Sequence, residues 1–385
     1  MLRTRKLTRP ACLFLAIIAI LGVGISALAT NGKVMKSVDY ADITMLLDGK
    51  QITLTDVNSN AVEPFAIDGT TYIPVRAMSE AMGYDVSWNQ GTSEISITSK
   101  PSLVVGTFNI DAKAPQTLVA DQRDLMAGYG VEIFGVQEVD VGLARYGIEE
   151  YDPFTDFTAS TYTDGFFGMS HAKGGEGAYG NGVVSAFALK EATVTELYGA
   201  AQAPQDLQEL VYASFKLKSS DPEYRSVMGA VWGPGGAMAN GGIEPRSYSR
   251  IVFEKDGKEI AFYSTHLSVE ALDVRMEQLQ ELREVLDNDP VEYKILVGDF
   301  NTDTSTSEYD IFLMGGYRLA NGNNGVWFNT VADDEVARDS LGLGSTNIGY
   351  LDNIIVSGNI RIDYVQMIRT DLSDHNALIA GLTLN

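Results

Sequence analysis

The sequence predicts an α/β (α+β) protein in which a small α+β domain precedes a large α/β domain. The chain has 385 residues, which exceeds the size at which single hydrophobic cores stop growing, so two folded domains are expected. Its 38 glycines indicate many turns and therefore a strand-rich chain. In the second part of the chain, short apolar runs that suit strands alternate with stretches of helical periodicity.

The first 29 residues have the pattern of an export signal. The basic residues at its start are Arg3, Arg5, Lys6 and Arg9. An apolar run over residues 12–23 follows, and Ala27-Leu28-Ala29 supplies the small residues that signal peptidase accepts. We therefore expect cleavage after Ala29 and a mature protein that is secreted or held at the extracellular side of the cell envelope. The alternative is an uncleaved membrane anchor, for which the apolar run is short.

The mature chain is expected to be strongly acidic and free of cysteine. The single cysteine, Cys12, lies in the signal, so no disulfide or thiolate metal site would remain. Removal of the signal takes four basic residues from the total of 28 and none of the 51 acidic ones, which leaves a formal net charge of −27. This charge argues against broad electrostatic affinity for DNA. A nucleic-acid substrate stays possible in principle, because bound divalent cations invert the local sign of the charge.

Residues 36–98 predict a small domain of short strands around one helix. Strands are expected at 43–47, 52–54, 72–75, 86–88 and 95–97. The helix is expected from Arg76 to Met82, where Gly83 stops it. The run from Asp68 to Gly83, followed by Val86-Ser-Trp88, resembles the copper amine oxidase N-terminal domain.

This resemblance does not imply copper, because residues 31–100 contain no histidine and no cysteine. We interpret the small domain as a spacer or attachment module, with cell-envelope material as its expected contact. Residues 99–102, which include Pro101, are the expected linker.

The large domain is expected to span residues 103–385 as alternating strands and helices. The expected strands cover residues 103–110, 133–139, 179–185, 211–217, 248–253, 259–264, 294–297, 352–357, 360–368 and 378–384. The expected helices cover residues 116–127, 269–287 and 309–314. Residues 151–177 and 228–244 are rich in glycine and predict loops. His171, in the first of these loops, is interpreted as a surface histidine, with a substrate-facing role as the alternative.

Polar residues able to bind a metal or transfer a proton stand at the ends of strand after strand. They are Asn109, Glu138, His266, Asp299, Asn301, Asp352, Asp374 and His375. Gly298 allows a tight exit from its strand, so that Asp299 and Asn301 can lean over the same sheet edge. Because active sites are assembled from strand-end loops, this pattern predicts one site rather than scattered structural roles.

The ordered set of motifs resembles the endonuclease/exonuclease/phosphatase superfamily from about Ser102 to the C-terminus. The matching motifs are Thr107-Phe-Asn109, Gly135-Val-Gln-Glu-Val139, Tyr179-Gly-Asn181, Ser264-Thr-His-Leu-Ser268, Gly298-Asp-Phe-Asn301, Leu351-Asp-Asn-Ile354 and Ser373-Asp-His375. The resemblance implies a four-layer α/β sandwich, in which two mixed β-sheets pack face to face between outer helices. Asn181 stands where deoxyribonuclease I has a glutamate, which weakens a specific deoxyribonuclease assignment.

The resemblance also implies a role for each residue. Glu138, with Asn109 and Asp374, would hold Mg²⁺ or Mn²⁺, hard ions that prefer oxygen ligands. His375 would act as general base on the attacking water, oriented by Asp352. The substrate would be held by the remaining residues: Asp299 and Asn301 would position the water and the phosphate, His266 and Arg246 would offset charge on the phosphoryl oxygens, and Tyr179 and Asn181 would contact the phosphate.

The function expected from these roles is that of an exported, metal-dependent phosphodiesterase that hydrolyses its substrate by in-line attack of water. A nuclease-like specificity is one option, and a sphingomyelinase-like phospholipase or a sugar or inositol phosphate phosphatase are others. A non-catalytic envelope-binding protein is the alternative from a different class. No obligate protein partner is expected.

Overall fold

The computed structural model describes residues 35–40, 42–47, 49–56, 60–112, 118–302, 306–332 and 349–385. The predicted signal peptide, with Ala29, lies outside these residues. The chain divides into two compact units, Met1–Val86 and Ser87–Asn385. This division falls within strand β5 (Tyr84–Asn89), before the linker expected at residues 99–102. Among the described residues, no helix has the length and apolar character needed to cross a membrane.

Short strands and one helix make up the described part of the first unit. Strands β1 (Met45–Leu47) and β2 (Lys50–Ile52) form one antiparallel pair, and β3 (Phe65–Ile67) and β4 (Thr70–Tyr72) form another. Helix α2 (Val75–Ala81) follows Pro74 and ends before Gly83, whose φ of +81° suits glycine. Strand β5 then pairs with β6 (Glu94–Ser99). Strands therefore lie on both sides of the one helix, as the sequence predicts, although β3 was not expected and β4 lies earlier than the strand expected at 72–75.

The second unit contains two six-stranded sheets of mixed direction. The first has the order β11-β12-β8-β7-β20-β19, and its strands are Asp164–Lys173, Gly177–Ser185, Ile133–Val141, Leu103–Asn109, Ala377–Leu384 and Ile360–Ile368. The second has the order β13-β14-β15-β16-β18-β17, and its strands are Glu191–Glu196, Ser247–Lys255, Lys258–His266, Tyr293–Asp299, Asp352–Val356 and Arg318–Leu319. Within each sheet one central pair is parallel, β7 with β8 and β15 with β16.

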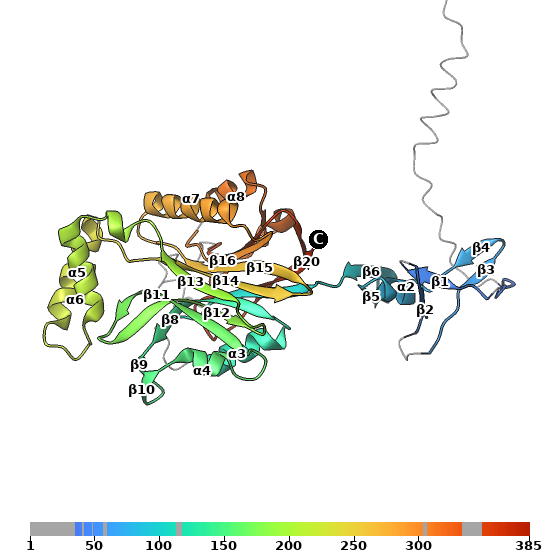
Figure 1. Ribbon diagram of the computed structural model, residues 1–385, viewed down its shortest axis with the longest axis horizontal. Helices are drawn as coiled ribbons and strands as arrows, with labels where there is room; N and C mark the ends of the chain where they lie inside the picture. Colours follow the sequence, from blue (N-terminus) through green and yellow to red (C-terminus); the bar gives the residue numbers. More distant parts are fainter. Residues whose placement is uncertain are drawn as a thin grey trace, which may run out of the picture. The chain divides into compact units, whose positions relative to one another are not determined.

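Helices cover the outer faces of both sheets, which gives the four layers seen in Figure 1. Helices α7 (Leu272–Asn288) and α8 (Asp310–Met314) lie over the second sheet, and α3 (Val119–Gly128) and α4 (Pro153–Phe157) over the first. The inner faces of the two sheets meet in a fully buried cluster that includes Val105, Ile133, Phe262, Ile295 and Val297. The predicted four-layer α/β sandwich is confirmed.

Three segments differ from the sequence expectation. The strand expected at 211–217 is part of helix α5 (Gln205–Lys216). Val211 and Phe215, four residues apart, pack with Val231 of helix α6 (Tyr224–Trp232) in a small cluster, and this packing decides for a helix. The loop expected at 228–244 contains the end of α6 and a turn of 3₁₀-helix, Met238–Asn240. The loop expected at 151–177 contains α4 and the whole of β11.

Candidate active site

Strand pairing in the second sheet brings three of the predicted site residues into one row. His266 is the register partner of Asp299 on the parallel strand β16, and Asp299 is the partner of Asp352 on β18. The strands approach closely here, because a Cβ on Gly298 would lie 2.2 Å from the carbonyl oxygen of Thr265. Only glycine fits at that point. All three residues of the row are at most 4% exposed.

His375 reaches this row from the segment before β20. Its Nδ1 lies 2.8 Å from Oδ2 of Asp352, so the carboxylate orients the imidazole ring. The hydroxyl of Ser373 donates to the carbonyl of Asn109 at 2.6 Å and accepts from the His375 backbone N–H at 3.1 Å. These contacts direct Nε2 of His375 toward Asp299, whose Oδ2 is 3.6 Å away.

Asn109 joins the row to the first sheet. Its Nδ2 donates to Oδ2 of Asp299 at 3.0 Å and to Oε1 of Glu138 at 3.2 Å. Its Oδ1 accepts from the backbone N–H of Asp111 at 3.1 Å. Glu138 lies in β8 with a φ of +56°, a left-handed conformation that is uncommon for a glutamate and that is associated with functional sites.

The electrostatics of the row suit proton transfer. Burial opposes a charge on His375, but the carboxylates of Asp352 and Asp299 outweigh it and raise the pKa of His375 well above its usual value. Burial raises the pKa of Asp299 to about 7, although His375 acts in the opposite direction. The raised pKa means that His375 has a high affinity for a proton. Neighbouring groups with strongly shifted pKa values are typical of catalytic sites.

A chain of charged side chains continues from His266 away from this row. Nη1 of Arg246 lies 3.1 Å from Nδ1 of His266. Because a guanidinium can only donate, His266 carries its own proton on Nε2, which lies 3.4 Å from Oδ2 of Asp299. Glu244 follows, with Oε2 3.3 Å from Nη2 of Arg246 and Oε1 3.4 Å from Nε2 of His171.

The two ends of the Glu244–Arg246 pair stabilise each other's charge. Burial would raise the pKa of Glu244, but Arg246 and His171 lower it to about 2. Burial opposes the charge on Arg246 as well, and the carboxylates of Glu244 and Glu270 raise its pKa. Arg246 is 5% exposed, and its Nε has no hydrogen-bond partner among the described residues. A ligand acceptor that reached this buried Nε would supply its missing hydrogen bond.

The remaining predicted residues make their contacts around this centre. Nδ2 of Asn301 donates to the carbonyl of Leu267 at 2.8 Å, and its backbone N–H donates to Oδ1 of Asp299 at 2.9 Å. Tyr179 is buried and stacks on the ring of His171, with ring centroids 5.0 Å apart. Asn181 donates to the carbonyl of Ser247 at 2.9 Å and so ties the two sheets together. Asp374 contacts the Ser373 hydroxyl at 3.4 Å and contributes to the raised pKa of His375.

A cavity of about 970 Å³ opens over these residues. Of the residues predicted from sequence, Glu138, Tyr179, Arg246, His266, Asp299, Asn301 and His375 line it. In the part of the chain that the structure describes, its lining does not include Asn109, Asn181, Asp352 or Asp374. Asn109 and Asp352 touch lining residues directly, so they position groups that face the cavity.

The donor set of this centre fits a hard divalent cation. Glu138 is partly exposed to the cavity, and Oδ1 of Asp352 is a buried acceptor with no hydrogen-bond partner among the described residues. Asp299, Asp352 and His375 each offer a ligand atom within 4.8 Å of the others. Oxygen donors of this kind suit Mg²⁺ or Mn²⁺. Asn109 turns its NH₂ group toward Glu138, so its oxygen could reach an ion there only after rotation of the amide.

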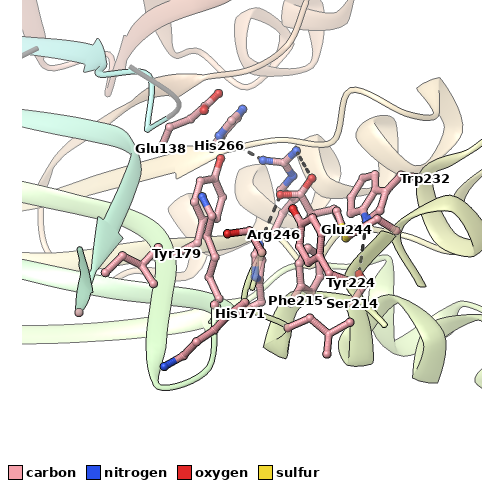
Figure 2. A pocket seen from close by; sticks show the side chains of 18 of the residues that line it. Glu138, His171, Tyr179, Ser214, Phe215, Tyr224, Trp232, Glu244, Arg246 and His266 are labelled. Atoms are coloured by element: carbon pink, nitrogen blue, oxygen red, sulfur yellow. Dashed lines mark hydrogen bonds and ion pairs between the residues drawn. The ribbon is translucent and has the colours of Figure 1, made fainter. Parts of the chain in front are cut away.

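Two residues of the site are not among the predicted site residues. His171, interpreted as a surface histidine with a substrate-facing role as the alternative, is 5% exposed and lies between Tyr179 and the ring of Phe215, whose centroid is 3.7 Å away. Figure 2 shows His171 and Glu244 beside Arg246. Glu244 lies in the loop expected at 228–244 and is not among the predicted site residues, although a carboxylate two residues before an arginine that leads into a strand is a signal that could identify it.

Two family profiles match the chain. Residues 105–375 match the profile of the endonuclease/exonuclease/phosphatase family. Residues 14–102 match that of the copper amine oxidase N-terminal domain, a match that begins inside the predicted export signal. Both resemblances inferred from the motifs are thereby confirmed. A comparison with curated protein sequences gives no match.

Several solved structures resemble the chain at low sequence identity. An endonuclease/exonuclease/phosphatase from Beutenbergia cavernae is 16% identical, with 74% of this chain and 72% of that chain covered and a TM-score of 0.49. The mannosyl-6-phosphatase of Bacteroides thetaiotaomicron is 17% identical, with 73% and 99% covered and a TM-score of 0.47. TDP2 of D. rerio, complexed with a single-strand DNA product, is 13% identical, with 73% and 98% covered and a TM-score of 0.48.

Proposed function

Because the chain belongs to the endonuclease/exonuclease/phosphatase family, we propose that it is an exported, divalent-metal-dependent phosphodiesterase that hydrolyses its substrate by in-line attack of water. The observation that carries the proposal is the continuous set of contacts from Asp352 through His375, Asp299 and Asn109 to Glu138. This set joins a proton acceptor to an acidic metal-binding side chain in one cavity.

The chain's own residues divide the work. His375, held through Nδ1 by Asp352, takes the proton of the attacking water at Nε2. Asp299 and Asn301 position the water and the phosphate. Arg246 and His266 offset the negative charge that develops on the phosphoryl oxygens. No side chain forms a covalent bond to the phosphorus.

The proposed cofactor is Mg²⁺ or Mn²⁺, held by Glu138 with help from Asn109 and Asp374. When bound, such an ion polarises a phosphoryl oxygen and stabilises the leaving group. The carboxylate of Glu138 would supply negative charge to the ion, and Glu138 lines the cavity that a substrate would enter.

Hydrolysis by the purified protein tests this proposal. We expect turnover in Mg²⁺ of at least one member of a panel of bis-p-nitrophenyl phosphate, plasmid DNA, RNA, sphingomyelin and inositol phosphates. Addition of EDTA should abolish that turnover, and excess Mg²⁺ or Mn²⁺ should restore it, because the ion offsets transition-state charge.

The outcomes of this panel separate the alternatives. Turnover of sphingomyelin or of inositol phosphates alone would identify the phospholipase or phosphatase branch. Turnover that persists in EDTA would remove the ion from the mechanism. Absence of turnover of every compound in the panel would favour the non-catalytic envelope-binding alternative, and binding to cell-envelope material would then be measured.

Deletion of residues 31–100 is expected to leave kcat and KM for a small phosphodiester within about twofold of the full chain. All described residues that line the cavity lie between Glu138 and His375, so the first unit supplies no described group to it. Its proposed role is attachment at the cell envelope. A tenfold loss of kcat/KM in the shortened protein, with unchanged circular dichroism of the second unit, would contradict this division of roles.

A further inference from the structure

The cavity continues from the catalytic residues to a helical insert between strands β13 and β14. Helices α5 and α6 of this insert supply part of the wall. Cavities of about 300–1,000 Å³ hold small organic ligands, and this one has about 970 Å³. There is therefore room beside the phosphate position for a sizeable part of the substrate.

The catalytic end of the cavity carries hydrogen-bond donors that suit a phosphate group. Arg246 and His266 present N–H groups there, and the buried Nε of Arg246 lacks a partner among the described residues. Charge-assisted hydrogen bonds from a guanidinium are well suited to phosphate oxygens. Glu138 lies at the same end of the view in Figure 2, on the His266 side of Arg246.

The opposite end is aromatic. Phe215 on α5 and Tyr224, Met228 and Trp232 on α6 line it. Nε1 of Trp232 donates to the Ser214 hydroxyl at 3.3 Å, which fixes the indole. The Trp232 side chain is nevertheless 39% exposed, although it lies in a concave site. Figure 2 shows it on the side of Arg246 and Glu244 away from Glu138.

The ring of Phe215 is already covered by another aromatic side chain. His171 stacks on Phe215 with a centroid distance of 3.7 Å, whereas the ring of Trp232 meets Phe215 only at a tilt of 59° and 5.9 Å. An anchored indole that is held by its N–H and left partly uncovered provides a stacking surface of low conformational cost. Stacking depends on the ring face of the ligand and not on its hydrogen-bonding edge.

We propose that the α5–α6 insert forms a subsite for the planar base of a nucleoside carried by the substrate, so that the substrate is a small phosphodiester with a nucleoside on the side of the phosphate that is not released. The inference rests on the proposed hydrolase function and adds the class of substrate to it. The phosphate lies at Arg246 and His266, and the ring stacks on Trp232.

Two other occupants fit the same wall less well. A long acyl chain would lie against Glu149, Lys218, Ser219 and Ser220, which also line the cavity, and would desolvate them without offering hydrogen bonds. Duplex DNA keeps its base faces stacked on one another, so they are not available to a side chain unless a nucleotide is flipped out. A single nucleoside presents both its ring face and its phosphate.

Esters with a common leaving group test the subsite. Methyl p-nitrophenyl phosphate, thymidine 5′-(p-nitrophenyl phosphate) and p-nitrophenylphosphorylcholine differ only in the second substituent, and all release p-nitrophenolate. In Mg²⁺ we expect kcat/KM for the thymidine ester to exceed that for the methyl ester by about 10- to 100-fold, the size of one base–aromatic contact. Trp232→Ala should remove this preference and leave turnover of the methyl ester within about threefold.

Two matched variants control for folding and for general effects of the insert. Trp232→Phe keeps a stacking ring and should retain most of the preference even if Trp232→Ala is poorly folded. Tyr212→Ala removes a ring of similar exposure, 38%, from the same insert but outside the described cavity lining, and should behave like the unaltered protein.

The outcomes separate this inference from the proposed function. Metal-dependent hydrolysis with equal kcat/KM for the methyl and thymidine esters would overturn the ring subsite alone. A preference for the choline ester, or a thymidine preference that survives in Trp232→Ala, would overturn it as well. Failure to hydrolyse any of the esters, or the panel above, would overturn the proposed function and the subsite together.

Discussion

Replacing His375 with alanine is expected to lower kcat for a phosphodiester by about 10²- to 10⁴-fold, the usual contribution of a positioned general base. KM should change much less, because the phosphate-binding groups Arg246 and His266 stay in place. The imidazole is buried, oriented at Nδ1 by Asp352 and directed at Asp299 by Nε2. Its loss therefore removes the group proposed to accept the proton of the attacking water. Steady-state kinetics in saturating Mg²⁺ provide the measurement.

The control for this variant concerns stability. Alanine at position 375 leaves the carboxylate of Asp352, which is 1% exposed, without its partner, and a buried charge without a partner is costly. His375→Gln can still donate to Asp352 through its amide and should be the more stable of the two, yet equally slow. Asp352→Asn should also reduce kcat, because the ring loses the group that fixes its proton. A stable His375→Gln protein that retains a tenth or more of the activity would disprove the assigned role.

Much of the centre could be predicted because sheet geometry turns strand ends into neighbours. His266 and Asp299 are far apart in the sequence, but each closes one of two adjacent parallel strands at the same register. Asp352 begins the antiparallel neighbour, so it meets the same edge. Any strand assignment that ends at these residues brings them together, whatever the exact bounds of the strands.

The wrong loop assignments fall at glycines that are required by contacts with distant strands, although glycine is also a typical turn residue. Gly168 favoured a loop over residues that form β11, whereas the strand expected at 179–185, which contains Gly180, lies within β12. A Cβ on Gly168 would lie 2.1 Å from the Ser249 hydroxyl of the other sheet, and one on Gly180 would lie 2.1 Å from the carbonyl of Gly168. These glycines allow close packing within strands. From the local sequence alone, a glycine of this kind cannot be distinguished from a glycine in a turn. The histidine between them, His171, was placed in a loop for the same reason.

The α5–α6 insert was missed because its apolar residues fit two periods. Val211, Ala213, Phe215 and Leu217 alternate as in a strand, whereas Leu207, Val211 and Phe215 recur every four residues as on a helix. Contacts with Val231 and Ala237 of the following segment select the helix. The aromatic end of the cavity depends on that helix, so the motifs located the strand-end residues but not the helical wall of the cavity.

Replacing Glu138 with glutamine is expected to raise the Mg²⁺ concentration needed for half-maximal activity by about 10- to 100-fold or more. Loss of a hydrogen-bond partner of a metal ligand already lowers metal affinity by about 10- to 100-fold, and loss of the ligand's own charge should cost at least as much. Glutamine has the size of glutamate, and its amide oxygen can still accept from Nδ2 of Asn109, so the bridge from β7 to β8 is preserved. Only the negative charge offered to the ion is lost.

Binding can be separated from catalysis in this variant. Bound Mg²⁺ stabilises the folded protein by an amount that grows with its concentration above Kd, so the melting temperature of the unaltered protein should rise as Mg²⁺ is added. That rise should require much higher Mg²⁺ in Glu138→Gln. Glu150→Gln removes an equal charge from an exposed position outside the described cavity lining and should match the unaltered protein. If Glu138→Gln kept both the Mg²⁺ response and the activity, the ion would be held by other groups, and the cluster of Asp299, Asp352 and His375 would be the place to look, because their ligand atoms lie within 4.8 Å of one another.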